Sequence, residues 1–228
     1  MAKDTGTAPA PRPAAKVRNV ALVGHTGAGK TTLAEALVEA LSASPRDGCS
    51  PDWVVHVPMD GYHLADVELA RLGRSDRKGA PDTFDADGYA ALLARLHQSA
   101  DAVVYAPAFD RTLEQPVAGS IPVLPTTRLV ITEGNYLLHD AGGWDRVRPH
   151  LDEVWFCDLD DDERRARLVA RHTRFGKQHE HAVHWVADVD ERNARLVGGT
   201  RERADLVVPG AVLRTIGPLG AALPTAVG

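Results

Sequence analysis

The feature that most constrains this chain is the stretch at residues 24–32, which reads Gly-His-Thr-Gly-Ala-Gly-Lys-Thr-Thr. It contains the spacing G-x-x-x-x-G-K-[ST], in which glycines let successive backbone N–H groups point into one concavity. An apolar run precedes it at residues 20–23, and a helical pattern of leucine and alanine follows it. A strand that turns into a helix through such a loop binds polyphosphate. The sequence therefore predicts a nucleoside triphosphate site, with Lys30 at the outer phosphates and Thr31 on Mg²⁺.

Length and composition favour a single α/β domain. The chain has 228 residues, 44% of them hydrophobic, which is enough for one substantial core. We expect a disordered Ala- and Pro-rich tail at residues 1–16, the folded domain at 17–216, and a flexible tail at 217–228.

Charge and hydropathy limit the partners that we expect. The formal net charge is -5 and no long basic block is present, so we expect no nucleic-acid partner. The sequence shows no signal-peptide core and no apolar run of about 20 residues, from which we expect a cytoplasmic protein without a membrane partner. The expected partners are ATP and a small molecule, and the pattern leaves a homodimer open.

Two carboxylates follow predicted buried strands. Asp60 comes after the strand at residues 53–57, and Glu133 comes after the strand at residues 129–132. In an open parallel sheet, ligands bind at the carboxyl ends of the strands, so both acids belong to the edge that carries the phosphate loop. Position alone also allows Asp60 to sit in an ordinary strand-ending turn. Acids beside a triphosphate require a divalent cation, because their charges would otherwise repel the ligand.

A further helix is predicted to start with Asp85 or Asp87 as its N-cap and to carry Tyr89, Leu92, Leu93 and Leu96 on its inner face. We expect that face to pack in the core.

A stripe of arginines marks the helix predicted at residues 161–174, which opens with acidic residues and ends with basic ones. Arg164, Arg167, Arg171 and Arg174 are spaced by three, four and three residues, which places them along one side of the helix. One interpretation is a lid that closes over the triphosphate and neutralises its charge. The other is a solvated basic face.

Proline and histidine shape two further segments. A buried strand is predicted at residues 102–105 and is expected to end before Pro107, which leaves Tyr105, Asp110 and Arg111 in a loop. Residues 114–127 hold three prolines and predict a projecting hairpin or an irregular loop. The histidines at 179–184 lack the H-E-x-x-H spacing, so we expect them at the exposed start of a helix over about 182–197, without zinc.

Four stretches together resemble the bacterial pantothenate kinase and uridine kinase group of P-loop kinases. They are residues 24–32, residues 59–63 (Met-Asp-Gly-Tyr-His), residues 77–81 with 84–85 (Arg-Lys-Gly-Ala-Pro and Phe-Asp), and residues 132–135 (Thr-Glu-Gly-Asn). The similarity spans about residues 17–209. It implies the P-loop NTPase fold: a five-stranded parallel sheet in the order 2-3-1-4-5, flanked by helices, with an arginine-bearing helical lid at about 164–181.

The resemblance and the residue pattern together define an expected site. The resemblance implies that Asp60 is the base, and Lys30 and Arg171 complete the expected catalytic set. The expected nucleotide-binding residues are Gly24, Thr26, Gly27, Ala28, Gly29, Lys30, Thr31, Thr32, Arg171, Arg174 and Asn193. The expected acceptor-binding residues are Asp60, Tyr62, His63, Arg77, Lys78, Tyr105, Asp110, Arg111 and Asn135. The expected metal ligands are Thr31 and Glu133.

These features predict a kinase that uses ATP and Mg²⁺ to phosphorylate a hydroxyl of a small metabolite. The acceptor stays open among a nucleoside, a sugar and a pantothenate-like compound. The alternative is a nucleotide-dependent regulatory switch with slow hydrolysis. Guanine-specific switches usually carry an Asn-Lys-x-Asp element, and this sequence contains no Asn-Lys pair.

Overall fold

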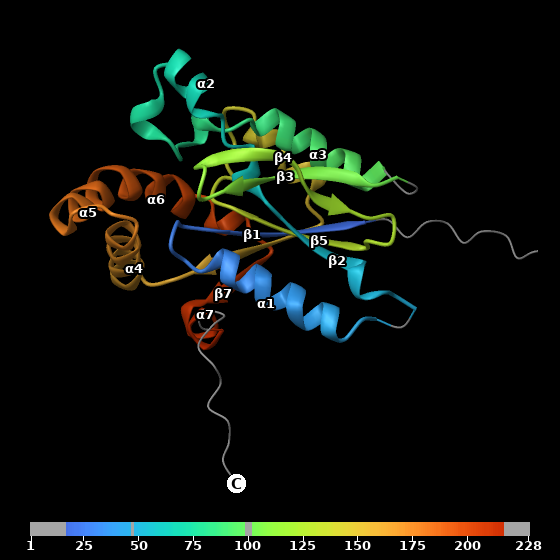
Figure 1. Cartoon of the computed structure of the whole chain (residues 1–228). Coiled ribbons are helices and arrows are strands. Elements are labelled where there is room, and N and C mark those ends of the chain that lie inside the picture. Colours follow the sequence, from blue (N-terminus) through green and yellow to red (C-terminus); the bar gives the residue numbers. More distant parts are fainter. Residues whose placement is uncertain (1–16, 47, 99–101, 217–228) are drawn as a thin grey trace, which may run out of the picture.

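The computed structural model describes residues 17–46, 48–98 and 102–216, so the tails expected at 1–16 and 217–228 lie outside it. A five-stranded parallel sheet forms the centre of the molecule (Figure 1). Its strands are β1 (Arg18–Gly24), β2 (Val54–Pro58), β5 (Leu129–Gly134), β6 (Glu153–Asp158) and β7 (Leu206–Pro209), arranged β2-β5-β1-β6-β7. Numbered among themselves these strands follow 2-3-1-4-5. The chain numbering differs because β3 and β4 lie outside this sheet. The predicted α/β P-loop fold class is confirmed.

Helices cover both faces of the sheet and bury two hydrophobic clusters (Figure 1). Successive residues of β1 point to opposite faces: Leu22 packs with α1 (Lys30–Ala43) and α7 (Gly210–Thr215), whereas Val23 packs with α3 (Ala86–Gln98). Because β1 is buried on both faces, its sequence contains the unbroken apolar run at residues 20–23.

Helix α3 begins as the sequence predicted. The Asp85 carboxylate accepts a hydrogen bond from the Gly88 backbone N–H at 2.8 Å, which satisfies a donor that the first helical turn leaves without a partner. Tyr89, Leu92, Leu93 and Leu96 are buried on its inner side. The apolar spacing therefore correctly predicted the core-facing side of this helix.

A two-stranded hairpin of β3 (Val104–Asp110) and β4 (Gln115–Val123) lies outside the main sheet. The prediction that Pro107 ends the strand is wrong: Tyr105 and Asp110, both expected in a loop, lie within β3, and only Arg111 follows it. The register shifts between Ala106 and Ala108, so Pro107 occupies a bulge where its missing N–H leaves no ladder bond unmade. The hairpin predicted from the prolines at 114–127 is confirmed in part, since β4 supplies its second strand.

The predicted lid, at about 164–181, falls in a helical segment that we call the lid region and that consists of α4 (Asp161–Arg174), α5 (His179–Trp185), a π-helical turn (Val186–Asp190) and α6 (Glu191–Gly198). Helix α4 has the predicted bounds, and the Asp160 carboxylate caps it by accepting from the N–H groups of Asp162 and Glu163. The helix predicted from about 182 instead begins at His179 and contains the π turn.

The remaining elements are short. Helix α2 spans Asp66–Arg71. Short 3₁₀ turns lie at Pro51–Trp53, Met59–Tyr62, Ser75–Arg77, Pro81–Thr83, Trp144–Arg146, Arg148–His150 and Arg201–Arg203. Among the described residues, none of the helices combines the length and the apolar character that crossing a bilayer demands.

Candidate active site

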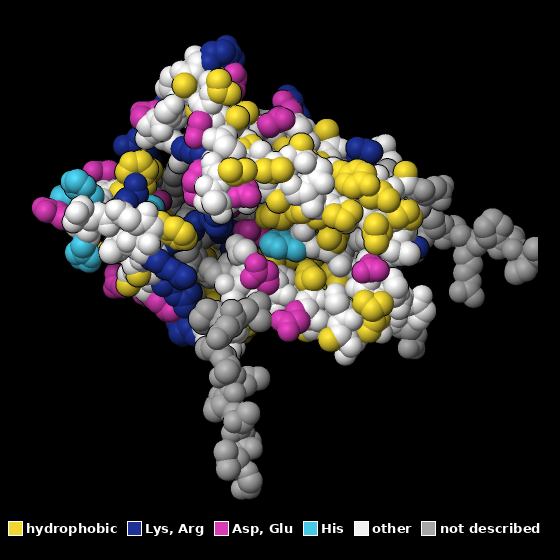
Figure 2. Space-filling model, viewed as in Figure 1, with side chains coloured by type: hydrophobic (Ala, Val, Ile, Leu, Met, Phe, Trp, Pro, Cys, Tyr) yellow, Lys and Arg dark blue, Asp and Glu magenta, His cyan; other side chains and the backbone are white. Residues whose placement is uncertain are grey.

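A cavity of about 680 Å³ opens at the carboxyl edge of the sheet, between the lid region and the hairpin. Figure 2 shows a hollow at this place, with both basic and acidic side chains visible in it. One wall comes from the phosphate loop and a second from the turns that follow β2 and β5. The hairpin and the lid region form the remaining walls, so segments far apart in the sequence line one cavity.

The phosphate loop has the backbone shape that its glycines predict. Gly27 and Gly29 adopt φ angles of 83° and 89°, in the left-handed region that residues with a Cβ rarely occupy. Lys30 begins α1 and is only 7% exposed. Its Nζ donates to the carbonyl oxygen of His25 at 2.9 Å and to Asn135 Oδ1 at 2.8 Å. Burial lowers the pKa of Lys30, and the nearby Glu133 carboxylate opposes that shift.

Thr31 and Glu133 form a pair that fits a magnesium site. The Thr31 hydroxyl donates to Glu133 Oε1 at 3.0 Å. Burial, and after it the charge of Asp60, raises the pKa of Glu133 to about 7. A buried carboxyl with a raised pKa gains from a nearby cation, and Mg²⁺ is often held by one or two protein oxygens with phosphates and water. The described residues include no cluster of three or more His, Cys, Asp or Glu that could bind a metal, so the phosphates would supply further ligands.

Asp60 lies in the 3₁₀ turn directly after β2 and faces the cavity. Pro58 and Glu133 are register partners on adjacent strands, which explains why the two acids share one edge. Arg111, in the hairpin turn, approaches the Asp60 carboxylate to 3.7 Å. Asp60 can therefore lie in an ordinary strand-ending turn and still be a carboxylate of the site, because this turn places it at the cavity.

An aromatic wall lies beside Asp60. The His63 ring lies 4.0 Å from that of Phe84 and 4.8 Å from that of Phe109, measured between ring centroids. His63 Nδ1 is 2.8 Å from the Asp60 carbonyl oxygen, and burial lowers the pKa of this histidine, which favours its neutral form. All three rings line the cavity. Phe109 was not predicted as a site residue, and the only sequence signal for it is its place two residues before Arg111.

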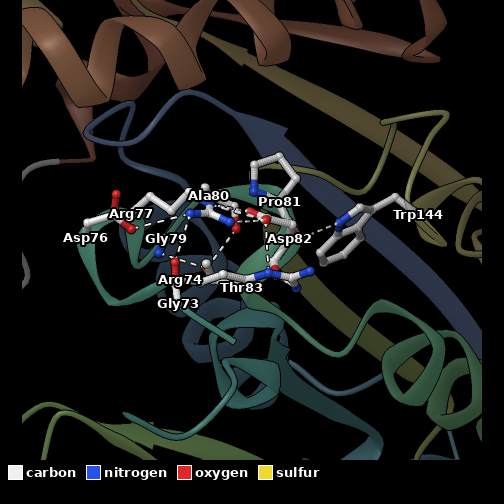
Figure 3. Close-up of polar contacts among 10 residues, drawn as sticks. All are labelled: Gly73, Arg74, Asp76, Arg77, Gly79, Ala80, Pro81, Asp82, Thr83 and Trp144. Atoms are coloured by element: carbon white, nitrogen blue, oxygen red, sulfur yellow. Dashed lines mark hydrogen bonds and ion pairs between the residues drawn. The ribbon is translucent and has the colours of Figure 1, made fainter. Parts of the chain in front are cut away.

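Hydrogen bonds and ion pairs hold the segment at residues 73–83 together (Figure 3). Only part of this segment lines the cavity. Arg77 binds Asp82 at 3.0 Å and the Gly73 carbonyl oxygen at 3.3 Å, while Trp144 Nε1 donates to the Pro81 carbonyl oxygen at 3.1 Å. Arg77 does not line the cavity, whereas the next residue does. We conclude that the guanidinium of Arg77 shapes the segment.

Lys78 joins this segment to the hairpin. Its Nζ donates to Asp66 Oδ1 at 2.6 Å and to the Glu114 carbonyl oxygen at 2.7 Å. The ammonium also lies 5.6 Å from the centroid of the Phe109 ring. Lys78 therefore closes the rim of the cavity between α2 and the hairpin turn.

The arginine stripe of α4 divides into different roles. Arg164 is 1% exposed and pairs with Glu191, and with Asp161 at 3.1 Å. Arg171 lines the cavity and has no carboxylate within 4 Å among the described residues. Arg171 is exposed to solvent overall, but partial desolvation and the charge of Arg111 lower its pKa, so an anion in the cavity would improve the environment of this guanidinium.

Arg167 and Arg174 differ from Arg164 and Arg171 in their positions and contacts. Arg167 lines the cavity but already pairs with Glu163 at 2.7 Å. Arg174 is exposed and does not line the cavity. The lid interpretation is thus best supported at Arg171, while Arg164 anchors α4 to α6.

The structure brings most of the expected site residues together. Those that line the cavity are Thr26, Gly27, Gly29, Lys30, Thr31, Thr32, Asp60, His63, Lys78, Arg111, Glu133, Asn135, Arg171 and Asn193. Those that do not are Gly24, Ala28, Tyr62, Arg77, Tyr105, Asp110 and Arg174. Asp110, for example, accepts from the N–H groups of Thr112 and Leu113 and so closes the hairpin turn. Among the missed lining residues are Phe175, Trp185 and Val189, which belong to the lid region and carry no recognisable motif.

Comparison with known proteins places the chain in a family. No family model matches the sequence. An Aspergillus versicolor protein named "ATP-dependent kinase-like protein notR'" is 35% identical over 161 residues, which cover 67% of this chain and 94% of that protein. The chain belongs to the uridine kinase-like family of P-loop kinases. This kinase is accordingly a phosphotransferase with an alcohol group as acceptor.

Further similar proteins and structures support the assignment of this kinase to the P-loop kinases. A Schizosaccharomyces pombe protein named "Putative uridine kinase C227.14" is 30% identical over 203 residues, covering 86% of this chain and 85% of that one. The solved structure of a "putative fructose transport system kinase" from Silicibacter sp. TM1040 superposes with a TM-score of 0.76 at 37% identity, covering 89% of this chain and 93% of that one. YFH7 from Saccharomyces cerevisiae, a P-loop kinase structure, matches with a TM-score of 0.71 at 20% identity, covering 85% and 92%, and shows the shared fold alone.

Proposed function

We propose that this kinase transfers the γ-phosphoryl group of ATP to a hydroxyl of a small metabolite, with Mg²⁺ held by Thr31 and Glu133. One observation carries the proposal: a single cavity is lined by the phosphate loop on one side and by Asp60 and Arg111 on the other. Such a cavity can hold a nucleotide and an acceptor at once, as in-line transfer between them requires.

Each group has a role that follows from its position. Phosphoryl transfer asks the protein mainly to position the reactants and to neutralise charge. Lys30 and Arg171 supply positive charge on two sides of the cavity, and Mg²⁺ when bound would neutralise the phosphate oxygens. Asp60 takes the proton of the acceptor hydroxyl late in the transfer. Arg111, 3.7 Å from Asp60, helps to hold that carboxylate in place.

The acceptor is a nucleoside, a sugar or a pantothenate-like compound. The aromatic wall of His63, Phe84 and Phe109 suits the flat or apolar face of such molecules, and the polar groups beside it suit their hydroxyls. Two relatives are named as a "putative uridine kinase" and a "putative fructose transport system kinase", and both of these acceptor classes lie within this range.

Acceptor-dependent ADP release tests the proposal. The purified kinase is supplied with ATP and Mg²⁺ and then with a panel of nucleosides, ketoses, aldoses and pantothenate. We expect one class to raise the rate of ADP release far above the basal rate, and mass spectrometry should detect the phosphorylated product. A slow rate that no acceptor changes would overturn the proposal and favour a nucleotide-dependent switch.

A further inference from the structure

The two residues that follow β5, Asn135 and Tyr136, contact different segments that line the cavity: Asn135 binds the phosphate loop, and the buried Tyr136 binds Gly79. Asn135 contacts the phosphate loop twice: its Oδ1 accepts from Lys30 Nζ at 2.8 Å, and its Nδ2 donates to Thr26 Oγ1 at 2.9 Å. Thr26 and Lys30 lie near the two ends of that loop. One amide group therefore ties both ends together.

Tyr136 contacts the acceptor side instead. Its hydroxyl donates to the carbonyl oxygen of Gly79 at 2.6 Å. Gly79 lines the cavity and lies between Lys78, which closes the rim, and the 3₁₀ turn at Pro81–Thr83. The Gly79 N–H donates to Thr83 Oγ1 at 3.0 Å, so both backbone polar groups of Gly79 are hydrogen-bonded.

The backbone on either side of Asn135 and Tyr136 has little room to move. A Cβ at Gly134 would lie 2.6 Å from Met59 Sδ, which shows how closely β5 packs on the turn that carries Asp60. Tyr136 and Leu137 are fully buried. A side chain on a rigid backbone positions its hydrogen-bond partner more precisely than one on a mobile loop. The reason is that the rigid backbone has less conformational freedom to lose when the contact forms.

We propose that Asn135 and Tyr136 are positioning residues that act on different substrates: Asn135 sets the phosphate loop for ATP, and Tyr136 sets the segment at 73–83 for the acceptor. This inference rests on the proposed function, in which one cavity binds both molecules. Asn135 thus acts through Lys30 and Thr26 and does not bind the acceptor. Its amide, unlike a carboxylate, holds Lys30 without adding negative charge where phosphate must bind.

Paired variants test the inference through two binding measurements. Asn135→Ala should weaken Mg·ATP binding, measured by calorimetry, by roughly ten-fold while the acceptor KM stays within about two-fold. Tyr136→Phe should raise the acceptor KM by a similar factor and leave Mg·ATP binding unchanged. Equal effects of both variants on both substrates would overturn the inference, as would no effect on either.

A double-mutant cycle tests the contact between Asn135 and Thr26. Thr26→Val removes the hydroxyl and should weaken Mg·ATP binding, whereas Thr26→Ser retains it and should restore near wild-type binding. In the Asn135→Ala background, Thr26→Val should have a much smaller effect, because the contact is already lost. Fully additive effects would contradict a shared role.

Hydrogen exchange separates failure of this inference from failure of the proposed function, because it requires no acceptor. Asn135→Ala should speed exchange in residues 24–32, and Tyr136→Phe should speed it in residues 77–83. Tyr89→Phe is the matched control, since this buried tyrosine also loses one hydrogen bond, to Thr132 at 2.5 Å, outside the cavity. The control should alter stability without changing either binding measurement. Exchange that changes in the same way in all three variants would overturn the inference.

Discussion

Arg111 and Asp60 meet across the cavity, with Nη2 and Oδ2 3.7 Å apart, although one comes from the hairpin turn and the other from the turn after β2. The pair is partly exposed, so its contribution to stability is small. Its consequence is geometric, because the contact ties the hairpin turn to the carboxylate that the proposed mechanism requires.

Replacing Asp60 by Asn tests this role. The amide keeps the shape of the side chain but cannot accept the proton, so turnover should fall by roughly 100-fold or more, about 3 kcal/mol of barrier. Binding of Mg·ATP, followed by calorimetry, should stay near that of the wild type. Asp145→Asn, at an exposed carboxyl in another turn, serves as the control and should leave both quantities unchanged. Full turnover in Asp60→Asn would assign Asp60 to the turn alone.

The two arginines Arg164 and Arg171 should respond differently to substitution. Arg164→Ala leaves Asp161 and Glu191 without their buried partner and should cost about 3 kcal/mol, lowering Tm by roughly 5–10 °C. Arg171→Ala should leave Tm nearly unchanged and lower kcat by roughly 100-fold, because it removes charge that faces the transferred group. Differential scanning calorimetry and steady-state kinetics measure the two effects. A solvated basic face predicts small changes for both variants.

Gly61 tests how closely the base and the hairpin are packed. A Cβ at this position would lie 2.3 Å from the Pro107 carbonyl oxygen, so the turn that carries Asp60 or the hairpin must shift. Gly61→Ala should therefore cost about 1–3 kcal/mol in urea unfolding and also lower kcat. Gly199→Ala is the matched control, since its nearest atoms lie at 3.6 Å and its φ is -62°. Wild-type kcat in Gly61→Ala would show that Asp60 needs no such precise placement.

His56 should make the kinase sensitive to acid. Burial lowers the pKa of His56 to about 4, and its Nε2 has no hydrogen-bond partner within the described part of the chain. The unfolded chain binds this proton near pH 6.5, so stability is complete above that pH and is lost as pH falls toward 4. Between pH 8 and pH 5 the free energy of unfolding should fall by about 1–2 kcal/mol from this residue.

Urea titrations at the two pH values measure this loss. His56→Gln should reduce the difference between pH 8 and pH 5, because the glutamine side chain has no proton to bind in this range. His179→Gln, at an exposed position, should leave the difference as in the wild type. An unchanged difference in His56→Gln would place the acid sensitivity at other groups, and burial also lowers the pKa of His25 and His63.

Local signals were sufficient for much of the fold. The spacing of leucines predicted the inner side of α3, and the acidic start with a basic end predicted α4 at its observed bounds. Pro107 shows where such signals fail. A proline ends a regular ladder, but a bulge in a hairpin places it where no ladder bond is needed, and only the partner strand decides that.

The candidate site shows the same limit. Arg77 and Lys78 are adjacent and equally basic in the sequence, yet Arg77 binds Asp82 and Lys78 closes the cavity rim. Arg164 and Arg171 share one helix stripe, yet one is buried in ion pairs and the other faces the cavity. Residue type and spacing place such groups on an element, but partners distant in the sequence determine their roles.

The sequence by itself determined the phosphate loop, the buried strands and the acids at their ends, because glycine conformations, apolar runs and strand ends are properties of neighbouring residues. The tertiary structure alone decided which charged side chains face the cavity, and that Asn135 holds the phosphate loop while Tyr136 holds Gly79. Those outcomes depend on burial and on contacts between β5, the loop and the segment at 73–83, which no local pattern encodes.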